Sequence, residues 1–305
     1  MTVATLQELG VFQELERYGH EQVCLFTDKE VGLRAIIAIH NTTLGPALGG
    51  CRMWTYADDL GAVYDALRLS RGMTYKAAAA GLNLGGGKAV VIGDPKRDKS
   101  EKVFRAFGRF IETLNGRYIT AEDVGTDVND MEYVHMETRY VVGVAPAHGG
   151  SGDPAPVTAY GVLQGIKACV HEMMGTERLE ERSVAIQGLG NVGEHLARHL
   201  VEAGAKVVAT DIDKARADRI ARELRIELVE PDAIYDVDAD VFAPCALGAV
   251  LNDDTIERCR FKIVAGAANN QLAEDDHGEA LRERGILYAP DYVINAGGII
   301  NVGIE

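Results

Sequence analysis

The sequence predicts an α/β protein with two domains, an N-terminal α/β domain and a C-terminal domain built on a doubly wound parallel sheet. The chain has 305 residues, more than one hydrophobic core usually holds. Residues 145–156 are rich in glycine and proline, which is typical of a connection between domains. Beyond them, apolar strands alternate with helical segments at the spacing of a doubly wound sheet. We therefore expect one domain over residues 1–145 and another over 146–305.

The first half predicts helices and strands in an irregular order. Its helices carry apolar residues three and four positions apart, such as Leu60, Val63 and Leu67. Ser100 has the side chain of a helix N-cap, and Gly116 can end the same helix. In chain order, the expected elements are a helix carrying Leu6, Leu9, Val11, Phe12 and Leu15, strands at 23–27 and 33–39, a turn-rich segment at 43–50, a helix from residue 59, a strand at 89–92, a helix from 100 to 116 and a strand at 118–120.

The second half predicts a regular alternation of strand and helix. A helical segment between two strands favours a crossover connection and hence parallel pairing. The expected elements are a helix at 157–174, a strand at 183–187, a helix ending at 204, and strands at 206–211, 241–243, 262–265 and 287–289.

Composition and charge exclude several classes of function. The net charge of −15 repels phosphate backbones and anionic lipid, so neither nucleic acid nor a membrane is an expected partner. The five cysteines form no CxxC pair, which favours reduced thiols over disulfides or a metal site. The N-terminus has no secretory signal pattern, and apolar runs such as Ala77–Leu84 are too short to span a bilayer. We expect a cytoplasmic protein.

The segment Gly188-Leu-Gly-Asn-Val-Gly193 matches the pattern GxGxxG. It follows an apolar strand and opens a helix, which is the context of a dinucleotide-binding Rossmann domain. In that reading Gly188 permits the tight turn, Gly190 lets a pyrophosphate approach the backbone, and Gly193 allows helix and strand to pack closely. Asn191 and Val192 complete the loop at the helix N-terminus, whose N–H groups favour phosphate. The alternative is a turn in an α/β domain that binds no ligand.

Asp211 ends the next expected strand, about 20 residues after the glycine pattern. A carboxylate there accepts hydrogen bonds from the ribose of the adenosine and repels a 2′-phosphate, which predicts NAD in preference to NADP. Lys214 and Arg216 lie nearby in the sequence and would weaken that preference.

Three residues of the first half predict the chemistry. Lys88 follows three glycines, and Asp123 follows a strand. A lysine desolvated beside another cation can serve as a base near neutral pH, and a carboxylate can relay its proton. Ala89 stands where a phosphate-binding P-loop needs Ser or Thr, so that motif does not apply. Lys76, near the end of a helix, could instead be an ordinary C-terminal lysine, and Asp123 an ordinary loop residue.

Seven segments carry a close resemblance to one known family, and they extend over essentially the whole chain. They are 43–54, 72–88, 118–125, 156–161, 243–249, 265–272 and 288–302. The sequence resembles the Glu/Leu/Phe/Val dehydrogenases, and most of all their leucine dehydrogenase branch. The resemblance implies reversible transfer of hydride from an amino acid to NAD, release of a 2-oxo acid and ammonia, and a homo-oligomer. It also implies several dozen mostly helical residues beyond the segment that ends this sequence.

The resemblance also implies roles for individual residues. Lys76 would hold the substrate α-carboxylate, Lys88 would be the general base that activates water, and Asp123 would relay protons. Four further positions match the substrate cleft and two match contacts near the nicotinamide. These are Gly49, Gly50, Met73 and Asn270 for the cleft, and Thr158 and Asn269 for the nicotinamide.

Substrate choice depends on the side-chain pocket, and the five matching positions are all apolar. They are Leu48, Ala121, Val142, Ile299 and Val302. None could pair a distal carboxylate, so a branched-chain amino acid is expected and glutamate is disfavoured. One alternative is a phenylalanine-type enzyme, which should have a roomier pocket. Another is a non-catalytic protein that senses NAD or an amino acid, although a sensor need not retain Lys76, Lys88 and Asp123 together.

Overall fold

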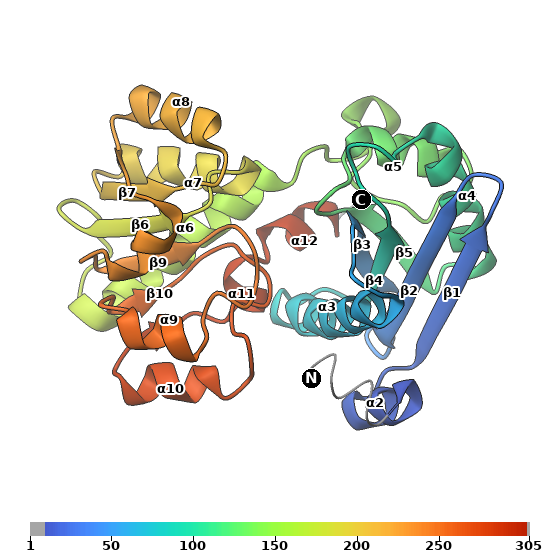
Figure 1. Cartoon of the computed structure of the whole chain (residues 1–305), viewed down its shortest axis with the longest axis horizontal. Helices are drawn as coiled ribbons and strands as arrows, with labels where there is room; N and C mark the ends of the chain where they lie inside the picture. The colour runs from blue at the N-terminus through green and yellow to red at the C-terminus, as the bar shows by residue number, and fades with distance from the viewer. Residues whose placement is uncertain (1–9, 304–305) are drawn as a thin grey trace. The chain divides into compact units, whose positions relative to one another are not determined.

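The computed structural model describes residues 10–303, so the expected helical positions Leu6 and Leu9 lie outside it. Contacts along the chain define two compact units, labelled by element in Figure 1. The first unit comprises Met1–Pro154 together with Ile299–Glu305, and the second comprises Ala155–Gly298. These ranges differ from the expected domains in two ways: the boundary follows Pro154 rather than residue 145, and the last residues belong with the first unit.

A mixed sheet of five strands, in the order β1-β2-β4-β3-β5, forms the centre of the first unit. β1 pairs antiparallel with β2, β2 pairs antiparallel with β4, and the remaining pairs are parallel. The elements are α2 (Val11–Tyr18), β1 (Gln22–Asp28), β2 (Leu33–Asn41), β3 (Ala47–Trp54), α3 (Asp59–Ala79), β4 (Gly85–Ile92), α4 (Glu101–Thr113), β5 (Tyr118–Glu122), α5 (Val128–His135) and the short 3₁₀ helix η1 (Pro146–His148).

Helices cover both faces of this sheet, because alternate strand residues are apolar on each side. On one face, Ile36 and Val90 pack against α3 through residues such as Leu67. On the other face, Ile37 and Val91 pack against α4 and α5. The same alternation places the side chain of Lys88 on the α3 face, two residues before Val90 on β4.

Two segments of the first unit differ from the sequence prediction. The turn-rich segment at 43–50 gives way to β3 at Ala47, and β4 begins at Gly85 rather than at residue 89. Both errors have one cause: glycine is disfavoured in strands by propensity, but the tertiary structure requires it in both. The expected elements at 33–39, 59 onward, 100–116 and 118–120 correspond to β2, α3, α4 and β5.

The second unit is a doubly wound sheet of six parallel strands in the order β11-β10-β9-β6-β7-β8. This confirms the predicted fold class. Its elements are α6 (Ala155–Met174), β6 (Ser183–Gln187), α7 (Asn191–Glu202), β7 (Lys206–Thr210), α8 (Lys214–Leu224), β8 (Glu227–Leu228), η2 (Pro231–Asp236), β9 (Val241–Pro244), α9 (Asp253–Arg258), β10 (Ile263–Val264), α10 (His277–Glu283), β11 (Leu287–Tyr288), α11 (Asp291–Ile294) and α12 (Gly297–Val302), of which the last continues into the first unit.

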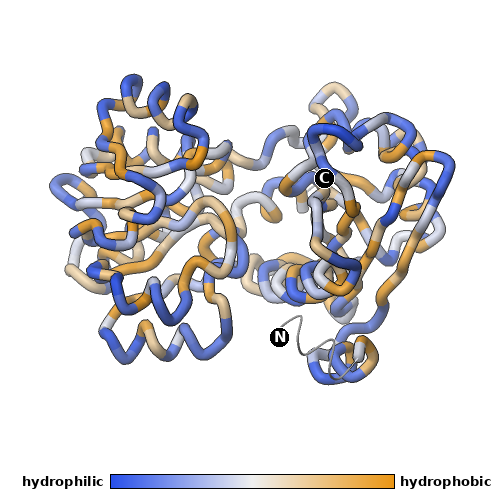
Figure 2. Tube along the Cα trace, in the orientation of Figure 1, coloured by the Kyte–Doolittle hydropathy of each residue, from blue (hydrophilic) through white to orange (hydrophobic). Residues whose placement is uncertain are grey.

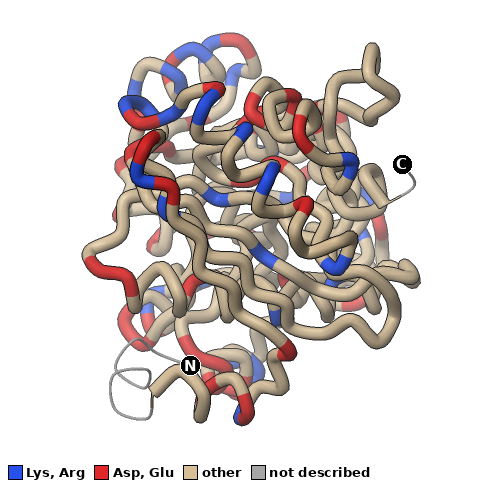
Figure 3. Tube along the Cα trace, turned by 90° about the vertical axis from the view of Figure 1, so that its right-hand side faces the viewer, with Lys and Arg blue, Asp and Glu red and all other residues tan. Residues whose placement is uncertain are grey.

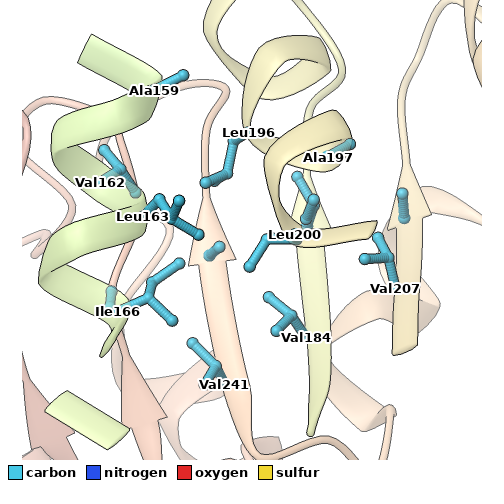
Figure 4. Packing of buried hydrophobic residues seen from close by; sticks show 14 of the residues in the cluster. Ala159, Val162, Leu163, Ile166, Val184, Leu196, Ala197, Leu200, Val207 and Val241 are labelled. Atoms are coloured by element: carbon cyan, nitrogen blue, oxygen red, sulfur yellow. The ribbon is translucent and has the colours of Figure 1, made fainter. Parts of the chain in front are cut away.

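Each face of the second sheet has its own apolar core. Figure 4 shows one of them, where Ile166 of α6 and Leu200 of α7 point toward Val184 and Val241 on the strands. The opposite core places η2, α9 and α10 over residues such as Phe242. β8, only two residues long, was absent from the sequence prediction.

Hydropathy and charge follow this layering. Figure 2 shows hydrophobic residues concentrated on the strands and hydrophilic ones on loops and outer helix faces. Figure 3 shows acidic and basic residues interspersed along helices and loops, while the strands are mostly uncharged. Among residues 10–303, no helix combines the length and apolar character needed to cross a bilayer.

Candidate active site

Lys88 and Asp123 form a buried ion pair in the first unit. Lys88 Nζ lies 2.9 Å from Asp123 Oδ2, and the two side chains are only 4% and 13% exposed. Lys88 belongs to β4, where it pairs with Ala38 of β2, and Asp123 directly follows β5. The sheet therefore brings together two residues that the sequence identifies as candidates in two separate segments.

The glycines before Lys88 let other elements approach β4. A Cβ on Gly86 would lie 2.1 Å from the backbone nitrogen of Thr74 in α3. A Cβ on Gly87 would lie 2.7 Å from the ring of Tyr118 on β5. Neither contact is compatible with a side chain, so packing inside the protein requires these glycines. They bring α3 and Tyr118 against the strand just before Lys88.

Gly49 and Gly50 on β3 have the same kind of role. A Cβ on Gly49 would lie 1.7 Å from the carbonyl oxygen of Gly87, and one on Gly50 would lie 2.9 Å from Asp123 Cβ. Each glycine thus makes room for the backbone beside one member of the ion pair. Their identity is explained by packing, whatever substrate contact they also make.

The charges around Asp123 keep it ionised. Burial opposes its ionisation, but the charges of Lys88 and Arg52 outweigh burial and hold the pKa of Asp123 well below its usual range. Arg52 Nε donates to the same oxygen, Asp123 Oδ2, at 3.0 Å. At neutral pH Asp123 is therefore a carboxylate that contacts two cations.

Sequence reasoning missed Arg52 and the two residues that hold it. Arg52 Nη1 donates to Asp65 Oδ2 at 2.8 Å, and the Tyr56 hydroxyl donates to the same oxygen at 2.6 Å. Arg52 could have been found as a charged residue on an apolar strand, but the sequence predicts a turn-rich segment at 43–50 and no strand there.

Lys76 and Met73 lie on α3, one helical turn apart. Lys76 is half-buried in the last turn of the helix, where a cation also interacts favourably with the helix dipole. Its position fits both a role in binding the substrate and that of an ordinary lysine at the C-terminal end of a helix.

Of the expected pocket residues of the first unit, Leu48 and Ala121 lie on the paired strands β3 and β5, Val142 follows an isolated bridge to β5, and Ile299 and Val302 lie on α12. Gly50 of β3 pairs with Ala121 of β5, and the N–H of Val142 donates to Thr120 O at 2.9 Å, on the other side of β5. Val302 approaches the adjacent Gly143, since a Cβ there would lie 3.9 Å from Val302 Cγ1. Leu48, Ala121, Ile299 and Val302 are all buried, and Val142 is half-buried.

The GxGxxG segment of the second unit forms the turn from β6 to α7. Gly188 has a φ of 99°, and a Cβ on Gly193 would lie 2.0 Å from Gly188 O, so backbone geometry and packing require both glycines. Apart from its two chain neighbours, no atom of residues 10–303 lies within 4 Å of where a Cβ on Gly190 would be. Gly190 is the N-cap of α7, with no capping side chain, and the helix begins at Asn191. An unhindered glycine at an uncapped helix N-terminus fits the approach of a dinucleotide phosphate.

Asp211 lies directly after β7 and supports the same turn. Its carboxylate accepts from the N–H of Leu189 at 2.7 Å and from the N–H of Asp213 at 2.7 Å. Arg216 Nη2 lies 3.0 Å from Asp211 Oδ1. Burial opposes ionisation of Asp211, but these donors lower its pKa. It is a fixed anion beside the glycine turn, and it is held partly by one of the two cations noted in the sequence.

The residues expected near the nicotinamide also lie in the second unit. Thr158 is in α6, and its backbone lies 2.9 Å from where a Cβ on Gly297 would be. Asn295 Nδ2 donates to Asn269 Oδ1 at 2.8 Å, and Asp291 accepts from the N–H of Asn270. Sequence reasoning did not single out Asn295 and Asp291.

Two family descriptions match the chain. "Glu/Leu/Phe/Val dehydrogenase, dimerisation domain" matches residues 20–140, and "Glutamate/Leucine/Phenylalanine/Valine dehydrogenase" matches 149–216 and 211–305. Leucine dehydrogenase of Thermoactinomyces intermedius is 63% identical over 97% of this chain and 81% of its own length. Phenylalanine dehydrogenase of Caldalkalibacillus thermarum (strain TA2.A1) is 51% identical over 94% of this chain and 79% of its own.

A solved structure shares the fold. The crystal structure of L-tryptophan dehydrogenase from Nostoc punctiforme superposes with a TM-score of 0.74 at 48% identity, covering 95% of this chain and 83% of that one. The family, the fold class and the two-unit organisation of such relatives are thus shared by this chain.

Proposed function

Because this chain belongs to the Glu/Leu/Phe/Val dehydrogenase family, we propose that it catalyses the reversible, NAD-dependent oxidative deamination of a branched-chain L-amino acid, that is leucine and also valine and isoleucine. The products are the 2-oxo acid and ammonia. The observation that carries the proposal is the buried contact between Lys88 and Asp123, in a chain 63% identical to a leucine dehydrogenase.

In this proposal each residue of the first unit has a separate task. Lys76 binds the α-carboxylate of the substrate as a cation. Lys88 acts as general base: it removes a proton from the water that attacks the imino carbon. Asp123, which contacts Lys88 Nζ, orients that amine and relays the proton.

The second unit holds the cofactor in this proposal. The family implies a nicotinamide cofactor, which when bound accepts the hydride from the substrate α-carbon. The N-terminus of α7 and the open Cβ side of Gly190 would take its phosphates. Asp211 would accept the ribose hydroxyls, which favours NAD over NADP. Thr158 and Asn269 would lie near the nicotinamide.

Apolar side chains support a branched-chain substrate. Leu48, Ala121 and Val302 are buried and offer no partner for a distal carboxylate, so a glutamate side chain would lose its hydration without compensation. Gly49, Gly50 and Met73 would complete the part of the substrate cleft that the first unit supplies, with Val142 and Ile299 in the side-chain pocket.

We also propose that the protein is a homo-oligomer. The description of the family segment that matches residues 20–140 as a dimerisation domain supports this. Light scattering coupled to size-exclusion chromatography measures the mass directly, and a single chain of 32.9 kDa as the only species would contradict it.

The function is tested by following NADH absorbance with leucine, valine, isoleucine, phenylalanine and glutamate. We expect the three branched-chain substrates to exceed phenylalanine in kcat/KM, and glutamate to be inert. Faster turnover of phenylalanine would indicate a phenylalanine-type enzyme. Binding of NAD without turnover of any amino acid would indicate a sensor.

The cofactor assignment is tested with Asp211→Ser. NAD should outperform NADP in the unmodified enzyme, and the substitution should narrow that ratio. Because Asp211 also accepts from the N–H of Leu189, the variant will weaken binding of both cofactors, so the ratio is the readout. A preference for NADP in the unmodified enzyme would overturn the assignment.

A further inference from the structure

We propose that Arg52 is a positioning residue for the reaction: fixed by Asp65 and Tyr56, it anchors the Asp123 carboxylate against Lys88. This inference rests on the proposed function, because it assigns Lys88 and Asp123 to catalysis.

Arg52 and Lys88 both contact one oxygen of the Asp123 carboxylate. Asp123 Oδ2 accepts from Arg52 Nε at 3.0 Å and lies 2.9 Å from Lys88 Nζ. Arg52 reaches it from β3 and Lys88 from β4, and the two strands are hydrogen-bonded neighbours. The carboxylate is thereby held between two cations on adjacent strands.

Arg52 is itself held in place by α3 and Tyr56. Its Nη1 donates to Asp65 Oδ2 on α3 at 2.8 Å, and that oxygen also accepts from the Tyr56 hydroxyl at 2.6 Å. The guanidinium is planar and presents its donors in a fixed fork, so two carboxylates on opposite sides define its orientation. With side chains 18% and 21% exposed, Arg52 and Asp65 are largely shielded from competing water.

Arg52 leaves a cation beside Asp123 when Lys88 gives up its proton. A general base must pass through a neutral form, and at that moment Asp123 loses one of its two cations. Burial would then favour a protonated Asp123. Arg52 remains charged throughout, since nearby Asp123 and Asp65 raise its pKa further despite its burial. Arg52 therefore keeps Asp123 ionised, so that the carboxylate can accept the proton and then return it to Lys88 or pass it on.

Besides Lys88 and Arg52, the titratable groups that interact with Asp123 include Cys51, Tyr56, Tyr118 and Glu122. Burial raises the pKa of the Cys51 thiol and of the Tyr118 hydroxyl, so both stay neutral near pH 7. Burial and neighbouring aspartates raise the pKa of Glu122 to about 7. The titratable and charged groups around Asp123 thus include Lys88 on β4, Arg52 and Cys51 on β3, Tyr118 and Glu122 on β5, Tyr56, and, through Arg52, Asp65 of α3.

The test compares Arg52→Gln with Arg34→Gln. Arg34 is the matched control, because it joins β2 to Asp59 of α3 by an arginine–aspartate contact of 3.4 Å that lies on the surface. Arg52→Gln should lower kcat for leucine about 10- to 100-fold, the loss of one charge-assisted contact, and change KM much less. It should also move the acidic limb of the kcat/KM profile up by about one pH unit, because removing the Arg52 cation favours the protonated form of the coupled Lys88–Asp123 pair.

Conservative variants separate positioning from a structural cross-link. Arg52→Lys should return the acidic limb of the kcat/KM profile to its pH in the unmodified enzyme, because it keeps a charge near Asp123. It should not restore full kcat, because an ammonium lacks the guanidinium fork. Tyr56→Phe should lower kcat less than Arg52→Gln does, and it should leave the pH of the acidic limb of the kcat/KM profile unchanged. A pH profile for Arg52→Gln that superimposes on that of Arg34→Gln would overturn the proposal.

Failure of the proposed function is distinguishable from failure of this inference. If the unmodified protein forms no NADH with any amino acid, the proposed function fails. The contact between Arg52 and Asp123 is then tested by a double-mutant cycle, in which the melting temperatures of Arg52→Gln, Asp123→Asn and the double variant are compared with that of the unmodified protein. Additive changes in that cycle reject the anchoring contact, and strong non-additivity supports it.

Discussion

The two glycine-rich segments of the chain look alike in sequence and differ in physical origin. In the first unit, Gly86 and Gly87 lie inside β4, where α3 and Tyr118 leave no space for a Cβ. In the second unit, Gly188 and Gly193 are required by the turn, whereas Gly190 has no protein atom near its Cβ position. A glycine that packing requires is a stability determinant, and one that packing leaves unexplained is a candidate for ligand contact.

The largest effect should follow substitution of the lysine that ends the first segment. Lys88→Ala should reduce kcat for leucine by roughly 10²–10⁴-fold, the usual contribution of a general base. NAD binding, measured by calorimetry, should remain, since the glycine turn and Asp211 belong to the second unit. Lys102→Ala, an exposed change on α4, is the control. Turnover above about a tenth of the unmodified rate would reject Lys88 as the base.

Two glycine substitutions test the difference between the glycine-rich segment of β4 and the glycine turn between β6 and α7. Gly86→Ala should destabilise the protein by about 3 kcal/mol, because the new methyl would meet the backbone of α3 rather than a flexible side chain. Gly190→Ala should leave the melting temperature almost unchanged and raise KM for NAD at least about tenfold, as expected for a lost close approach. Thermal melts and NADH kinetics on both variants check this. Equal melting temperatures for the two variants would remove the distinction between the segments.

The smallest effect concerns the acids at the ends of two strands, one in each unit. Donors around Asp211 lower its pKa despite burial, whereas burial and then the charges of neighbouring aspartates raise the pKa of Glu122 to about 7. Unfolding returns Glu122 to its ordinary value near 4.5, so the folded state binds more protons between these values and loses stability as pH rises through them.

Glu122→Gln should therefore stabilise the protein at pH 8 by about 1 kcal/mol, allowing for the partial exposure of this side chain. The gain over the unmodified protein should shrink as pH falls toward 5. Melting temperatures of both proteins from pH 5 to pH 8 measure it, with Asp211→Asn expected to destabilise instead. A constant difference across that range would contradict the raised pKa.

The α/β class and the parallel sheet of the second unit could be inferred from the amino-acid sequence, and the family with its function from the resemblance of seven of its segments. The fold class depends on local signals: apolar periodicity, the spacing of GxGxxG, and caps such as Ser100, whose Oγ accepts from the N–H of Val103. Lys88 and Asp123 were found as candidates because each lies in a recognisable local segment.

The contacts of those candidates follow from the packing of elements that are distant in the sequence. β3 was missed because its glycines oppose strand propensity, and they are needed only because β4 and the backbone at Asp123 pass so close. Arg52 was missed with that strand, and its partner Asp65 is one polar residue among many on α3. The contacts of Arg52 with Asp65 and Asp123 join residues 13 and 71 positions apart. No local pattern encodes such pairings, because they depend on how strands and helices that are distant in sequence pack together.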